Sequence, residues 1–240
     1  VLMRIITISR EFGSGGREMG RHLAKALDYD YYDREIITAL SNETSLNEEF
    51  IEKTLDTGIF PTFTLTFGKT FTTMGNTTVK GIGATKLLVR ETQIIKEIAK
   101  KNRNCVIVGR NADILLKKYN LVNLFVYACM ESKLKRCLNH KGDESLSLKQ
   151  LEKKIKQIDK NRASHRQLLS NKKWGDKENF DLCINTTGLV IKDLIPFIIQ
   201  YTDFLFEKKR WNYNINKKDV SNLKYKFKLE TSFLLTIFKI

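Results

Sequence analysis

Cysteine is scarce in this chain, and the few cysteines are not paired in sequence. The 240 residues include Cys105, Cys129, Cys137 and Cys183, and no two of them form a C-x-x-C motif. A disulfide framework or a zinc site needs closely spaced cysteines, often with histidines beside them. We therefore expect reduced cysteines that fill a core, with a metal site as the less favoured alternative.

Histidines and long apolar runs are scarce as well. The three histidines, His22, His140 and His165, are scattered and suggest no pairing of a nucleophile with a base. No run approaches the roughly 20 apolar residues that span a bilayer. The first residues, VLMRIITISREFG, lack the basic and then apolar arrangement of a secretory signal. We expect a cytoplasmic protein without a membrane partner.

Acidic residues are outnumbered in two segments, which together account for the net charge of +15. Residues 131 to 173 hold 13 Lys and Arg against 5 Asp and Glu, and residues 208 to 240 hold 9 against 2. Charge is balanced over the rest of the chain. The excess is therefore regional, which favours two basic segments with separate roles over a uniformly cationic surface.

Apolar segments with the character of strands alternate with segments of helical periodicity. The expected strands are Arg4 to Ile8, Tyr29 to Asp33, Asn104 to Gly109, Leu121 to Ala128 and Phe180 to Thr186. The expected helices include Ser45 to Leu55, Ala84 to Asn102 and a long basic region from Glu131 to about Leu169. This alternation, in a chain with 42% hydrophobic residues, predicts an α/β domain whose parallel sheet is covered on both faces.

Two further segments are less regular. Residues 56 to 83 are rich in Thr, Phe and Gly, which favours a surface excursion or a small hairpin over a pair of core strands. A last helix carries apolar residues at Leu194, Phe197, Ile198, Tyr201 and Leu205. Pro196 fits the first turn of that helix if Asp193 is its cap, because the first turn needs no amide donor.

The stretch ITISREFGSGGREMG, which ends at Gly20, places glycines between the first strand and the first helix. Such a turn can aim several backbone N–H groups at one point, because glycine adopts positive φ angles and lets an oxyanion approach. The helix adds its positive end. The Walker A motif G-x-x-x-x-G-K-[ST] is not met, because Gly16 takes the lysine position and Arg17 is displaced by one residue. On this motif alone, a phosphate cradle and a glycine-rich turn without a ligand are both open.

Several segments occur in the order, and at roughly the spacing, of one family. They are ITISREFGSGGREMG, YDYYDREII, CVIVGRNAD, DKNRASHR and WGDKENFDLCINTTGL. From about Met3 to Glu207 the chain resembles the cytidylate kinase-like proteins, relatives of bacterial cytidylate kinase among the P-loop nucleoside monophosphate kinases. The resemblance implies a P-loop NTPase fold: a five-stranded parallel sheet flanked by helices, an ATP site at the glycine loop, a monophosphate site across the cleft, and a mobile helical lid at about residues 131 to 173.

The resemblance does not cover the basic, aromatic segment 208–240. A docking arm and an added strand are both open for this segment, and so is a homodimer.

Arginines are the expected catalytic residues, because phosphoryl transfer needs positive charge and positioning more than acid or base chemistry. Arg110 follows Gly109 directly after the third expected strand, at the carboxyl edge where doubly wound sheets bind ligands. The resemblance places Arg110 on the acceptor phosphate. Asp113 could take an acceptor hydroxyl or cap a helix.

The segment DKNRASHR adds further candidates. Asp159, Arg162 and Arg166 lie three or four residues apart on one helix face, so one carboxylate and two guanidinium groups could converge there. The resemblance gives this segment roles on the sugar and phosphate of the acceptor, in a lid that closes over the phosphates and excludes water. The alternative is an exposed ion pair.

The residues of the loop are the expected ATP-binding set. They are Gly13, Ser14, Gly15, Gly16, Arg17 and Glu18. Arg17 is the candidate substitute for the absent lysine, although Arg10 could reach the same place. Asp33 matches the aspartate that opens the family's D-S-G motif and is expected on the monophosphate, but Arg34 and Glu35 replace the Ser-Gly. Trp174 is expected to pack in the ordinary way rather than to frame the adenine or the lid hinge.

Magnesium is expected to enter with the nucleotide, and its protein ligands are not identified. Bacterial cytidylate kinase has an acidic residue before its G-R, where this chain has Val108. Only the nucleotide phosphates, water, Ser9 or Ser14 offer oxygen ligands.

The leading hypothesis is therefore an ATP-dependent nucleoside monophosphate kinase, with CMP or dCMP as acceptor and ATP with Mg²⁺ as donor. The missing lysine and Val108 favour the alternative of a nucleotide-binding sensor or scaffold that has lost the chemistry. A nucleic-acid surface on the basic segments is the least favoured alternative, because the lid also explains their charge.

Overall fold

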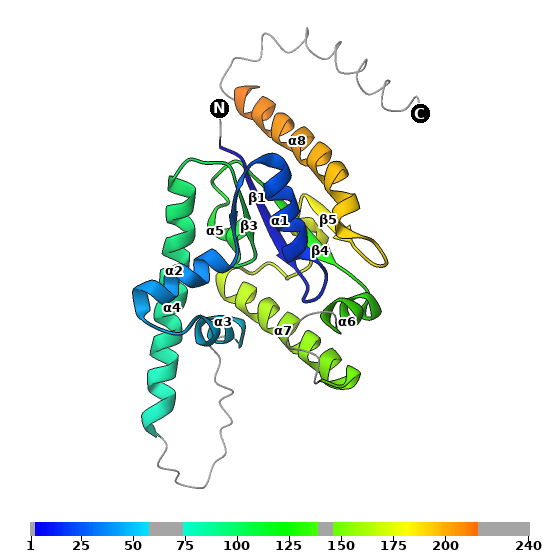
Figure 1. Cartoon of the computed structure of the whole chain (residues 1–240). Coiled ribbons are helices and arrows are strands. Elements are labelled where there is room, and N and C mark those ends of the chain that lie inside the picture. Colours follow the sequence, from blue (N-terminus) through cyan, green and yellow to red (C-terminus); the bar gives the residue numbers. More distant parts are fainter. Residues whose placement is uncertain (1–2, 58–73, 139–145, 216–240) are drawn as a thin grey trace.

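A five-stranded parallel sheet forms the centre of the molecule (Figure 1). The computed structural model describes residues 3–57, 74–138 and 146–215. The strands are β1 (Ile5–Arg10), β2 (Asp30–Tyr32), β3 (Cys105–Val108), β4 (Leu121–Tyr127) and β5 (Leu182–Asn185). They lie in the order β2-β3-β1-β4-β5, and every neighbouring pair is parallel. All five carboxyl ends therefore lie at one edge, and the expected fold class is confirmed.

The central strands are apolar on both faces because helices cover both. On β1, Ile5 belongs to one core cluster, whereas Ile6 and Ile8 belong to the other. The first face is covered by α2 (Arg34–Thr44), α4 (Met74–Lys100) and the short α5 (Ala112–Leu115). The opposite face is covered by α1 (Gly16–Leu27) and α8 (Ile191–Ile215), as Figure 1 shows. Burial of β-branched side chains in these two layers is the main stabilising contribution.

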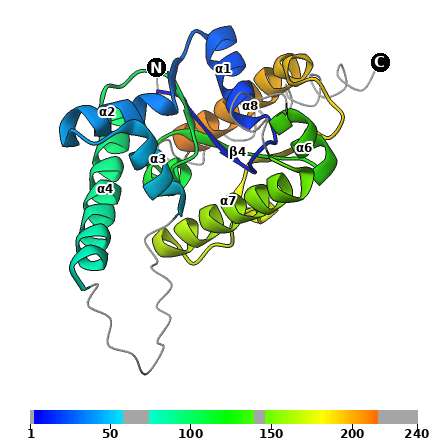
Figure 2. The same cartoon turned by 60° about the horizontal axis from the view of Figure 1, so that its bottom comes forward.

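The remaining helices lie at the carboxyl edge of the sheet (Figure 2). They are α3 (Glu48–Thr57), α6 (Met130–Leu138) and α7 (Leu148–Leu169), and a 3-10 turn at Lys177–Asn179 precedes β5. The helix α7 begins at a capping box in which Ser147 and Gln150 satisfy each other's backbone amides. A small apolar cluster joins α6 to α7 and includes Phe12 of the glycine loop.

Two boundaries of the expected helices are wrong. The helix α4 begins at Met74, ten residues before the expected start. The rest of the expected hairpin, residues 58–73, lies outside the described part of the chain. The last helix begins at Ile191, so Asp193 is not its cap and Pro196 lies one turn inside. The basic region from Glu131 to Leu169 is helical as expected and contains two helices, α6 and α7.

The cysteines agree with expectation only in part. All four are free. Cys105 and Cys137 are buried and Cys183 is half-buried in β5, but Cys129 is exposed and cannot fill a core.

The helix α8 runs without interruption past Glu207, the expected end of the domain, to Ile215. Among the helices in the described ranges, none is both long and apolar enough to cross a membrane.

Gly15 provides a test of the loop's backbone. Its φ of +85° is strained for any other residue, and a Cβ there would lie 2.6 Å from Cδ1 of Ile191. Gly188 has a φ of +69° but no atom within 4 Å of such a Cβ. We expect Gly188→Ala to lower the free energy of unfolding by about 1–2 kcal/mol through φ alone, and Gly15→Ala to lower it further. Urea unfolding measures both, and equal losses would contradict the steric argument.

Candidate functional site: a glycine loop beside an arginine-lined pocket

The glycine loop keeps its shape through hydrogen bonds that consume its carbonyl groups. The Ser14 hydroxyl donates to the Glu11 carbonyl at 2.8 Å, and the Thr186 hydroxyl donates to the Ser14 carbonyl at 2.7 Å. Arg136 on α6 donates to the Thr186 carbonyl at 2.6 Å. Ser14 is fully buried, so its side chain shapes the loop and does not face a ligand.

The amide groups of the loop are used differently from its carbonyls. Within the described residues, the amides of Gly13, Gly15 and Gly16 donate to no protein acceptor. Gly13 and Gly15 have φ angles of +74° and +85°. Successive amides in such a turn, followed by a helix N-terminus, form a concave site for an anion. The backbone of the loop therefore has the geometry that an anion site needs.

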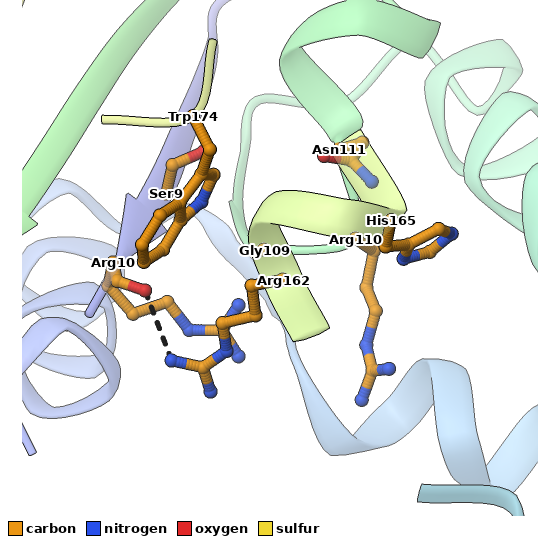
Figure 3. Close-up of a pocket in the computed structure, with 8 residues that line it drawn as sticks. All are labelled: Ser9, Arg10, Gly109, Arg110, Asn111, Arg162, His165 and Trp174. Atoms are coloured by element: carbon orange, nitrogen blue, oxygen red, sulfur yellow. Dashed lines mark hydrogen bonds between the residues drawn. The ribbon is translucent and has the colours of Figure 1, made fainter. Parts of the chain in front are cut away.

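A pocket opens beside the loop at the carboxyl edge of the sheet (Figure 3). Its lining residues are Ser9, Arg10, Gly109, Arg110, Asn111, Arg162, His165 and Trp174. Three arginines and no carboxylate line it, although each of these arginines pairs with a carboxylate that is not a lining residue. The cavity volume is about 40 Å³, which is room for a few water molecules. Ligand pockets usually measure about 300 Å³ or more, so a nucleotide would require the lining side chains to move.

Arg10, the last residue of β1, extends across the floor of this pocket. A Cβ on Gly109 would lie 1.6 Å from Arg10 Nη1, so the guanidinium group lies directly on the glycine backbone. Burial lowers the pKa of Arg10 to about 9, and the Arg162 charge acts in the same direction. The Asp33 carboxylate opposes this only in part, at 3.8 Å from Arg10 Nη2.

Arg110 lies on a strained turn after β3. Gly109, Arg110 and Asn111 have φ angles of +76°, +58° and +52°, in the left-handed region that only glycine adopts without cost. Strain of this kind persists where the surrounding structure holds it, and it concentrates at functional sites. The Arg110 side chain is buried, and its Nε lies 3.4 Å from the Glu91 carboxylate.

Asp159 and Arg162 of α7, two of the three residues expected to converge, lie together against the loop, and a lysine joins them. Asp159 accepts the Phe12 amide at 2.7 Å and pairs with Arg162 at 3.6 Å. Arg162 also donates to the Arg10 carbonyl at 3.1 Å, the bond drawn in Figure 3. Lys133 of α6 donates to Asp159 and to Glu11, each at 3.0 Å. These hydrogen bonds raise the pKa of Lys133 even though burial opposes them.

Arg166 and Asp113 do not reach the pocket. Arg166 donates to both oxygens of Asp113, at 3.2 and 2.8 Å, and the two side chains are 1% and 5% exposed. The Arg166 guanidinium also stacks on Phe180, at 5.3 Å from the ring centroid. The helix α7 therefore directs Arg162 and Arg166 to different places. Asp113 caps no helix either, since it lies within α5 and Asn111 occupies the cap position.

Arg17 is not a lining residue of the pocket either. Its Nε lies 2.5 Å from Asp33, and its Nη2 lies 3.3 Å from Glu52 on α3. These carboxylates raise the pKa of Arg17 although burial lowers it. Asp33 is 2% exposed and, in this structure, a partner of Arg17. Glu18 is exposed and faces His22 one turn along α1.

Sequence reasoning missed Asn111, Lys133, Arg136 and His165, and it assigned Trp174 to ordinary packing. Trp174 does pack edge to face on Phe125, as expected, but it also borders the pocket. Lys133 and Arg136 lie in α6 on either side of the exposed Lys135. Nothing in the sequence separates these two from their neighbours, because that depends on which face of α6 meets the loop.

The pocket does not form a magnesium site of its own. Ser9 is the one hydroxyl among its lining residues, and the Ser14 hydroxyl is bonded within the loop. Across residues 3–57, 74–138 and 146–215, no three His, Cys, Asp or Glu side chains cluster in a way that could hold a metal. Magnesium prefers to keep several waters and phosphate oxygens as ligands, so water and the nucleotide phosphates would supply its ligands here.

The glycine loop between the first strand and the first helix of this parallel sheet gives the chain the P-loop fold. The chain belongs to the cytidylate kinase-like family, whose model matches residues 5–188.

Two solved structures share the fold. An uncharacterized protein from Eubacterium ventriosum is 24% identical, with a TM-score of 0.60, and the match covers 84% of this chain and 99% of that one. Shikimate kinase from Acinetobacter baumannii is 18% identical, with a TM-score of 0.50, and the match covers 83% and 92%. No curated protein gives a significant match.

Proposed function

We propose that the protein transfers the terminal phosphoryl group of ATP to a nucleoside monophosphate, with CMP or dCMP as the preferred acceptor. The observation that carries this proposal is the juxtaposition of unpaired loop amides with the arginine-lined pocket at one edge of the sheet. Both provide what a transferred phosphoryl group needs, namely fixed positive charge with little water. Family membership supports the same class of reaction.

In this proposal each part of the site has one task. The amides of Gly13, Gly15 and Gly16 bind donor phosphates, and Arg110 with Arg162 binds the acceptor phosphate. Asp33 and Asp159 are within reach of the acceptor sugar and base once they exchange their present partners. Mg²⁺ comes in with ATP. Arg166 and Asp113 position α7 over the site and do not touch the substrate.

A coupled assay with ATP and a panel of monophosphates tests the proposal. We expect turnover with CMP or dCMP at a kcat/KM at least tenfold above that for AMP, GMP and UMP. The reason is that the four bases differ in the hydrogen-bond donors and acceptors that they present to the site. Shikimate, an acceptor without phosphate, is included because a shikimate kinase shares the fold. Turnover of shikimate alone would replace the acceptor in the proposal, and no turnover with any acceptor would reject it.

Nucleotide binding without transfer is a second candidate. It is favoured by the contacts of Lys133, Glu11 and Asp159, which hold α6 and α7 against the loop and leave little space in the pocket. Calorimetry with ATP and CMP separates the two functions. Binding of ATP with no transfer to any acceptor would favour the sensor.

A further inference from the structure

This loop departs from the Walker A motif at residues 10, 16 and 17, and the first two departures are complementary. In G-x-x-x-x-G-K, the first glycine corresponds to position 10 and the lysine to position 16. This chain has Arg10 and Gly16 there. A cation has replaced a glycine at one position, and a glycine has replaced a cation at the other.

The structure explains why these two departures belong together. A Cβ on Gly16 would lie 2.6 Å from Arg10 Cβ and 3.0 Å from Arg10 Cγ. Real Cβ atoms do not approach other carbons so closely, because repulsion rises steeply below van der Waals contact. The stem of Arg10 therefore fills the space through which a side chain at position 16 would leave the backbone. Only one of the two positions can carry a long side chain.

The guanidinium group of Arg10 ends in the arginine-lined pocket. It lies on Gly109, and its side chain is only 11% exposed. Arg110 and Arg162 line the same pocket (Figure 3). Asp33, at 3.8 Å, is the one carboxylate paired with it among the described residues. A buried guanidinium beside two others is stabilised by an anion placed among them.

We propose that Arg10 replaces the P-loop lysine and that its guanidinium group binds phosphate oxygens of the nucleotide donor. This inference rests on the proposed function and identifies the cation that takes the place of the missing lysine. During transfer the bond from the γ-phosphorus to the bridging oxygen breaks, and its electron pair leaves with ADP. An oxygen of the acceptor phosphate forms the new bond to phosphorus. Arg10 keeps its proton throughout and stabilises charge on the transferred group.

Arg17, the nearer candidate in sequence, is less suited to this task. It is held by Asp33 and Glu52, so binding a phosphate would require it to leave two carboxylates. Arg10 would give up only the long contact to Asp33. The exchange of partners therefore costs less for Arg10.

An exchange of side chains tests the inference. Arg10→Met keeps the stem of Arg10 and removes its charge, and we expect a loss of about 100-fold in kcat/KM for ATP. Gly16→Lys alone introduces the clash with Arg10 and is expected to be inactive. The double variant Arg10→Gly/Gly16→Lys restores the first glycine and the lysine of the motif, while Arg17 stays at the position of its Ser or Thr. We expect this variant to recover to within about tenfold of the wild type, because the lysine then occupies the vacated path. Arg103→Ala, which removes an exposed arginine at the opposite edge of the sheet, is the matched control and should leave activity unchanged.

A second measurement makes the test independent of the acceptor. ATP without acceptor should raise the melting temperature of the wild type. The increase should be much smaller for Arg10→Met and should return in the double variant. If the wild type binds ATP but turns over no acceptor, the proposed function is rejected. The change in melting temperature on ATP binding then still tests the inference about Arg10. Full activity and an unchanged shift in Arg10→Met would overturn the inference. A folded double variant with no more activity than Arg10→Met would also overturn it. The same holds if Arg17→Ala loses activity and the ATP-induced shift while Arg10→Met keeps both.

Discussion

Replacing Asp113 with alanine is expected to lower the free energy of unfolding by about 3–5 kcal/mol, because it leaves the Arg166 guanidinium buried without its carboxylate. Both Arg166 donors to Asp113 lie in a region with 1% side-chain exposure, and Arg166 Nε has no partner among the described residues. Water cannot compensate for the lost charge at such depth. Urea unfolding followed by circular dichroism measures the effect, which is a large fraction of the stability of a typical domain.

The double variant Asp113→Leu/Arg166→Met is the control. Replacing a buried ion pair with apolar side chains of similar volume is often neutral, so we expect most of the lost stability to return. Kinase activity of this double variant separates two roles for Arg166. Activity within tenfold of the wild type supports a positioning residue, and loss of activity in a stable double variant would restore Arg166 to the catalytic set. A loss below 1 kcal/mol in Asp113→Ala would contradict the argument from burial.

The fold could be predicted because its signals are local. Apolar runs such as Ile5 to Ile8 and Cys105 to Val108 are short and flanked by turns, and the glycines after β1 mark the strand-to-helix loop. Boundaries were less accurate where local signals conflict. Pro196 suggests a helix start, yet α8 begins a turn earlier, because Ile191 is buried against the same core as the rest of the helix.

The arginines of the site were only partly predictable, because helical spacing defines a face and not the partner that meets it. Asp159 and Arg162 share a face and do converge on the loop. Arg166, one turn further, has moved past the edge of the pocket and meets Asp113 instead. Arg10 and Gly16 required the three-dimensional structure, because their steric exclusion joins two positions six residues apart through backbone geometry.

Removing the Arg110 guanidinium is expected to reduce kcat/KM for the acceptor monophosphate by about 1,000-fold, while the KM for ATP changes little. The reason is that Arg110 is held on a strained backbone, at a φ of +58°, with its side chain buried at the pocket. A donor fixed in this way stabilises charge without reorganising, and loss of one such donor costs about 10² to 10³ in rate. Steady-state kinetics with each substrate varied separately measures the two effects.

Arg110→Ala alone would also deprive the buried Glu91 carboxylate of a nearby cation, so the variant to measure is Arg110→Ala/Glu91→Gln. Glu91→Gln by itself reports how much of the loss comes from that carboxylate.

Asn111→Gly controls for the backbone, because it relieves a φ of +52° on the same turn without removing a charge. We expect Asn111→Gly to be as stable as the wild type or more stable, since glycine adopts this conformation without cost. If the ATP and monophosphate parameters deteriorate equally in the Arg110 variant, then Arg110 supports the whole pocket and does not bind the acceptor. A separate loss for the monophosphate, with ATP binding intact, requires a direct contact between this guanidinium and the acceptor phosphate.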